Sequence, residues 1–158
     1  QAEDGIRDRS PSRGLGDVYK RQFPIRTTPE LLFEAISSPR GLDAWWSNHC
    51  SGNPAMGANY SFDFGPEYQW IAEVTSYEFA KAFELEFVQS DLDWNGSKVG
   101  FLIEPDGEFT QLKFYHTGWP TLNEHFKISN YCWAMYLRLL KRYLEFGECV
   151  AYEERLNV

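Results

Sequence analysis

The sequence predicts one α+β domain in which two short helices follow the first strand, an antiparallel sheet comes next, and a long helix packs across that sheet. Two observations support this fold class. In residues 121–147 the apolar side chains recur at three- and four-residue steps, which places them on one stripe of an α-helix. Between residues 58 and 116 the period changes to two, as in strands with one buried face. A chain of 158 residues is long enough for a substantial core.

The long C-terminal helix is the clearest element. Thr121 and Glu124 have the spacing of a capping box at its start, and Gly147 can adopt the left-handed conformation that ends a helix. A helix with one apolar stripe needs a broad partner, which the sheet supplies. The stripe consists of Phe126, Trp133, Leu137, Leu140 and Leu144.

Two start signals mark the short helices. Residues 23–26 look like the remnant of a first strand, and Thr28 before Pro29 is typical of an N-cap followed by proline at the first helical position. Ser38 before Pro39 repeats this signal, so a second helix is expected to reach residues 45–46. Residues 48–57 contain two glycines and a proline and are predicted to be a loop.

Five later segments alternate apolar and polar residues: 60–64, 70–74, 83–87, 99–103 and 112–116. Asp106-Gly107 is a strong hairpin signal between the last two. Because the connections are short, sequential antiparallel pairing is expected. The apolar face of such a sheet must be covered, and the long helix can cover it.

Residues 1–22 show neither period and match, codon by codon and in frame, a translated sequencing-library adapter. We therefore expect residues 1–22 to be an adapter artefact and not native protein. Residues 23–147 are expected to form the folded domain, and residues 148–158 a C-terminal tail whose role the sequence does not indicate.

Composition narrows the classes of function. The net charge of −8 argues against nucleic acid and anionic membrane surfaces as partners. No segment has the length and apolarity of a membrane span or the pattern of a signal peptide. Cys50, Cys132 and Cys149 are too few and too scattered for a disulfide framework, which favours the cytoplasm. We find no phosphate-binding glycine motif, nucleophile motif or metal-ligand spacing, so no cofactor and no metal are predicted.

Several motifs in this order resemble the START-like (SRPBCC, helix-grip) superfamily. They are Ser38-Pro39 before Trp45-Trp46, Phe109-Thr110 in a late strand, His116-x-Gly118-Trp119, and the helical stripe from Trp133 to Gly147. Within the superfamily, the chain is most similar to the branch related to the C-terminal domain of activators of the heat-shock-protein-90 ATPase. The resemblance implies a curved antiparallel sheet that grips the C-terminal helix, with an apolar cavity between them.

Aromatic residues, which make up 17% of the chain, supply the candidate site. Tryptophan carries an N–H group that needs a partner when buried, and a purely structural core more often uses leucine and valine. We therefore predict that inward-facing rings line a cavity for a small hydrophobic or aromatic ligand, against the alternative that they simply fill a solid core. The predicted ligand-binding residues are Trp45, Trp46, Phe62, Trp70, Phe101, Phe114, His116, Trp133 and Leu137.

Two other functions stay open. His116 shares the inward parity of Leu112 and Phe114, so it could orient a polar group of a ligand or act as the proton-transfer group of a cyclase or dehydratase. Such a residue is more often simply a hydrogen-bonded core histidine, and no second titratable partner is evident in the sequence. The resemblance to chaperone activators also suggests a protein-interaction module with a chaperone or another protein as partner.

Overall fold

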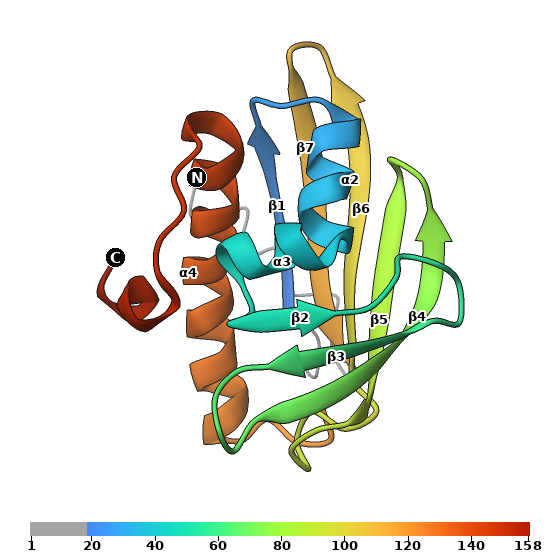
Figure 1. Ribbon diagram of the computed structural model, residues 1–158, viewed down its shortest axis with the longest axis vertical. Coiled ribbons are helices and arrows are strands. Elements are labelled where there is room, and N and C mark those ends of the chain that lie inside the picture. Colours follow the sequence, from blue (N-terminus) through green and yellow to red (C-terminus); the bar gives the residue numbers. More distant parts are fainter. Residues whose placement is uncertain (1–18) are drawn as a thin grey trace.

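The computed structural model describes residues 19–158 and confirms the predicted fold class (Figure 1). Two short helices follow the first strand, and one long helix follows the last. In chain order the elements are β1 (Tyr19–Ile25), α2 (Pro29–Ser37), α3 (Pro39–Trp45), β2 (His49–Ser51), β3 (Asn59–Asp63), β4 (Gln69–Glu78), β5 (Ala82–Gln89), β6 (Lys98–Asp106), β7 (Phe109–Thr117), α4 (Glu124–Phe146) and the 3-10 helix η2 (Tyr152–Asn157).

In this part of the chain seven strands form one antiparallel sheet in the order β1-β7-β6-β5-β4-β3-β2. The strands from β2 to β7 follow one another along the sheet, as short connections favour. β1 pairs with β7 and so closes the opposite edge. The sheet curves around α4, and α2 and α3 lie against the same side of the sheet as α4 (Figure 1). The core therefore lies between the concave face of the sheet and the three helices.

The helix ends follow local side-chain chemistry. Thr28 Oγ1 accepts a hydrogen bond from Leu31 N at 3.2 Å, and Ser38 Oγ accepts one from Gly41 N at 2.9 Å, so both predicted N-caps are confirmed. The predicted capping box of α4 is wrong, because the cap is Asn123. Its side-chain oxygen accepts from a backbone N–H inside the first turn, which shortens the helix at its start. Gly147 ends α4 with a φ of 70°.

One edge of the sheet differs from the sequence prediction, and the other takes one of two expected forms. Residues 48–57 were expected to form a loop, yet His49–Ser51 form the edge strand β2. β2 has only three residues, of which Cys50 alone is buried, so the strand is too short to show an alternating pattern in sequence. Pairing with β3 stabilises it. At the other edge the shortened first strand was expected to be poorly formed or to be patched by residues 18–22 of the adapter segment. β1 begins at Tyr19, which pairs with His116, so residues 19–22 extend the strand.

Residues 19–22 of the expected adapter segment therefore form part of β1. Pairing in a sheet joins backbone groups, so it accepts many sequences. The Tyr19 hydroxyl is buried without a hydrogen-bond partner. The remaining adapter residues lie outside the described part of the chain, and the adapter origin stays a prediction.

The C-terminal tail is docked against the domain. The buried Arg155 guanidinium donates to Asp43 O at 2.6 Å and to Ser47 O at 3.1 Å, and so satisfies carbonyl groups at the end of α3. Its Nε donates to Val150 O within the tail at 3.0 Å. Tyr152 Oη donates to Phe64 O, just beyond β3, at 3.0 Å. The tail therefore links α3 to the end of β3.

Candidate functional site

The seven aromatic residues predicted from sequence meet between the sheet and α4, and all are buried. Trp46 is central, with its ring centroid 5.0 Å from that of Trp133 and 5.1 Å from that of Phe62. The Phe114 ring lies 4.5 Å from Trp133 and 5.4 Å from Phe101. These distances are those of rings in direct contact.

The remaining predicted aromatic residues extend this group in two directions. Trp45 packs edge-on against Phe101 at 6.2 Å and donates its Nε1–H to Ala35 O at 2.9 Å, so it anchors α3 to α2. Trp70 joins through Phe87 at 5.8 Å. We call the set formed by the seven predicted aromatic residues, Phe87, Trp94, His116 and Trp119 the ring cluster.

His116 lies inside the ring cluster with both ring nitrogens engaged. Trp133 Nε1 donates to His116 Nδ1 at 3.0 Å, which requires Nδ1 to be the acceptor. Nε2 therefore carries the proton and donates to Ser97 Oγ at 2.9 Å. Ser97 Oγ in turn donates to Trp94 O at 2.6 Å. This chain of donors fixes one neutral tautomer.

The electrostatics agree with a neutral His116. Burial, with a smaller contribution from the charge of His125, lowers the pKa of His116 to about 3. Since both nitrogens are occupied and water is excluded, the ring does not exchange protons readily near neutral pH. Of the roles left open by the sequence, the contacts favour the hydrogen-bonded core histidine over the acid or base.

Two tryptophans that the sequence prediction missed complete the ring cluster. Trp94 follows β5 in a turn and is 7% exposed, and Trp119 follows β7 and is 2% exposed. Their centroids lie 4.5 and 4.7 Å from that of His116, and 5.7 Å from each other. Each sits among polar residues in an irregular segment, where alternation gives no signal. Trp119 stands in the motif His116-x-Gly118-Trp119, and for Trp94 the only sequence signal is a large aromatic residue that a polar loop does not need.

The indole N–H groups of Trp94 and Trp119 are buried without a hydrogen-bond partner. Trp45 and Trp133, in contrast, both donate to protein acceptors. Leaving one such donor buried and unpaired costs about 1–3 kcal/mol. Two of them in contact with the same histidine distinguish this end of the ring cluster from an ordinary core.

A polar network borders this end of the ring cluster. His125 Nδ1 lies 3.0 Å from Asp93 Oδ2, and Asn123 Nδ2 donates to Asp93 Oδ1 at 3.1 Å. These bonds, with the one to His125 the stronger influence, lower the pKa of Asp93. The network ties the turn that carries Trp94 to the first turn of α4.

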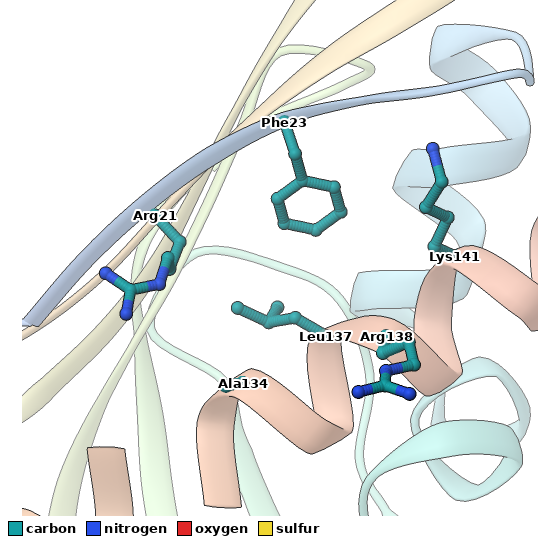
Figure 2. A pocket seen from close by; sticks show the side chains of 6 residues that line it. All are labelled: Arg21, Phe23, Ala134, Leu137, Arg138 and Lys141. Carbon is teal, nitrogen blue, oxygen red and sulfur yellow. The ribbon is translucent and has the colours of Figure 1, made fainter. Parts of the chain in front are cut away.

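A separate pocket of about 300 Å³ lies between β1 and α4 (Figure 2). Phe23 from β1 and Leu137 from α4 point toward each other across it, and Ala134 adds to its apolar wall. Arg21, Arg138 and Lys141 surround this apolar part. Arg21 belongs to the residues that are expected to be adapter sequence.

Of the nine predicted ligand-binding residues, Leu137 lines this pocket and the other eight pack in the ring cluster. A second pocket, of about 330 Å³, lies where the β6–β7 hairpin meets the start of α2, and it contains none of the nine. The assignment of the nine residues to ligand binding stays a prediction.

Within residues 19–158, no group of three or more His, Cys, Asp or Glu side chains is placed to hold a metal ion. Among the helices of the same residues, none combines the length and apolarity needed to cross a membrane.

Comparisons with known proteins agree with the fold. Residues 26–145 match the family model described as "Activator of Hsp90 ATPase homolog 1-like protein". The solution structure of the Aha1 dimer from Colwellia psychrerythraea is similar at 26% identity and a TM-score of 0.75, covering 83% of this chain and 98% of that one. A search of curated proteins finds no match.

Two crystal structures at lower identity share the fold. Protein MLL2253 from Mesorhizobium loti matches with 20% identity and a TM-score of 0.71, covering 83% of this chain and 98% of that one. CalU16 from Micromonospora echinospora matches with 15% identity and a TM-score of 0.64, covering 87% of this chain and 81% of that one.

Proposed function

Because the chain belongs to the family of activator of Hsp90 ATPase homolog 1-like proteins, within the START-like superfamily, we propose that it is a binding domain for a small hydrophobic or aromatic molecule. The ligand would lie between the sheet and α4, in contact with the ring cluster. Aromatic side chains supply large apolar contact areas with few rotatable bonds, which suits the recognition of a flat apolar molecule.

The observation that carries this proposal is the pair of unpartnered indole N–H groups of Trp94 and Trp119. A solid core built only for stability pairs such donors, as this protein does for Trp45 and Trp133. The cost of leaving two donors unpaired is understandable if a bound molecule satisfies one or both of them.

Binding can be tested by calorimetric titration of the full chain with naphthalene-sized aromatic compounds. Replacing Trp94→Leu removes a ring but keeps the site apolar. Since an aromatic contact is worth about 0.5–1.5 kcal/mol beyond its area, we expect affinity to fall by up to about tenfold. Tyr68→Leu is the matched control, because Tyr68 is exposed and touches Trp70 from outside the cluster. Equal effects of the two replacements, or no saturable binding to the unaltered chain, would contradict the proposal.

A second candidate is a protein-interaction module. The relative from Colwellia psychrerythraea is described as a dimer, and the family name refers to activation of the chaperone Hsp90. In this chain Ile128 and Tyr131, one turn apart on α4, are 56% and 76% exposed. Apolar side chains adjacent on an exposed helix face are common at interfaces.

For this candidate we expect a dimer whose dissociation is promoted by Tyr131→Ser. Light scattering after size-exclusion chromatography over a range of concentrations measures it, with Tyr77→Ser on the β4–β5 hairpin as the control. A chain that stays monomeric and shows no binding to purified Hsp90 would exclude the interaction role. We propose no catalytic role for His116, because both of its nitrogens are held by Ser97 and Trp133.

A further inference from the structure

Trp119 lies outside the helices and strands, as Trp46 and Trp94 do. Trp45, Trp70 and Trp133 lie in helices or strands, whereas Trp119 belongs to residues 118–123, which form neither. In this Trp119 segment its side chain is the only fully buried one. The segment thus contributes one large ring to the interior and little else.

Four aromatic rings lie against Trp119. Its centroid lies 4.7 Å from that of His116 and 5.7 Å from that of Trp94. On the α4 side, Phe126 packs edge-on at 5.2 Å and His125 at 5.8 Å. No hydrogen bond from the indole N–H holds it in place. Contacts of this kind depend on a flat aromatic ring and not on a hydrogen bond from the indole.

The two ends of the Trp119 segment are fixed. Gly118 has a φ of 83°, and a Cβ there would lie 3.2 Å from Gly96 O, so its backbone is packed tightly against the preceding turn. Asn123 caps α4 and donates to Asp93. Among the described residues, residues 119–122 make no backbone hydrogen bond, so displacing the ring would not require β7 or α4 to unfold.

We propose that, in the ligand-free protein, Trp119 occupies the place of an aromatic ligand of about its own size, and that binding displaces it. The ligand would be a planar bicyclic aromatic compound that carries an acceptor oxygen, to which Trp94 Nε1 donates. Displacement also brings the Trp119 N–H into water. This inference rests on the proposed binding function and adds the position and chemical class of the ligand.

The position of Trp119 near the surface would also give a ligand access to the site. Trp119 is the cluster member whose neighbours in sequence, Gly118 and Pro120, are both exposed. The polar network of Asp93, Asn123 and His125 lies beside it, so a bound molecule would have its ring inside and solvated polar groups near the opening.

Fluorine NMR of the full chain labelled with 5-fluorotryptophan tests the displacement. Six tryptophans give six signals, which are assigned with single Trp→Phe variants. On titration with 2-acetylnaphthalene we expect the Trp119 signal to move to the position of a solvent-exposed indole as the site fills. Saturable binding with an unmoved Trp119 signal would overturn the inference and leave the proposed function intact.

Affinity measurements separate the remaining outcomes. Trp119→Ala removes the competing ring and should tighten binding of 2-acetylnaphthalene by about tenfold, whereas Leu122→Ala, in the same segment and exposed, should have no effect. If Trp119→Ala does not fold, the NMR result on the unaltered chain decides alone. Equal affinity for 2-ethylnaphthalene, which lacks the oxygen, would remove the role of Trp94. Absence of binding to the unaltered chain and to Trp119→Ala would overturn the proposed function and this inference together.

Discussion

His116 illustrates how burial determines the behaviour of one side chain. Its ring donates to Ser97 and accepts from Trp133, so only the neutral form fits its partners. A proton added at Nδ1 would point at the Trp133 N–H, so two hydrogen-bond donors would face each other and the bond would be lost. The sequence identified the inward parity of His116, but it could not show its two partners, which come from the residue before β6 and from α4.

The lowered pKa of His116 predicts a pH dependence of stability. The unfolded chain takes up a proton as the pH falls through the ordinary value of 6.5, whereas the folded protein resists protonation down to about 3. Below pH 6.5 the free energy of unfolding should therefore fall with pH, by about 1.4 kcal/mol per pH unit from this group. Urea unfolding at a series of pH values measures the slope.

His116→Gln provides the comparison, because an amide keeps one acceptor and one donor and does not titrate. The slope between neutral pH and the acid range should flatten in this variant. If both proteins lose stability in parallel, other groups account for the effect.

At the scale of the elements, the long periodic segments were predictable and the short irregular ones were not. The stripe of α4 and the alternation of β5 express one buried face over many residues, so the pattern is visible in sequence. β2 has three residues and depends on its neighbour for stability. The N-cap of α4 shifted from Thr121 to Asn123, because either residue can cap and tertiary contacts decided between them.

The tail is the element whose role only the structure reveals. Arg155 places its charge against the carbonyl end of α3, where the helix dipole favours a cation. Its partners, Asp43 and Ser47, precede it by more than one hundred residues. Neither periodicity nor a local motif can show contacts between such distant positions.

Arg155→Met should detach the tail, since methionine keeps an apolar stem and loses the donors. Hydrogen bonds from a charged group are worth about 1.5–3 kcal/mol each, so we expect a loss of at least about 2 kcal/mol in the free energy of unfolding. Thermal unfolding and limited proteolysis of residues 148–158 measure the change. Glu153→Gln, exposed in the same turn, is the control and should have little effect. A tail equally protected in both variants would show that Arg155 is dispensable.

At the scale of the whole molecule, the fold followed from the order of elements, and the resemblance to the START-like superfamily anticipated the arrangement of sheet and helix. The interior was harder to foresee. Sequence parity placed Trp46, Trp133 and the phenylalanines on inner faces, but it could not decide whether a concave sheet leaves room between them. In the described residues the rings of these side chains are in contact. The feature that differs from an ordinary core is the pair of buried, unpartnered indole N–H groups of Trp94 and Trp119.

The ring cluster also determines what intrinsic tryptophan fluorescence can report about this protein. Trp46 lies within 5.0 Å of Trp133, and Trp94 lies 5.0 Å from Trp70 and 6.0 Å from Trp133. At such separations absorbed energy passes from one indole to the next before it is emitted, so intrinsic fluorescence averages over the group. A change in emission on adding a compound would thus record a disturbance anywhere among these tryptophans, and residue-specific labels are needed to say which of them moved.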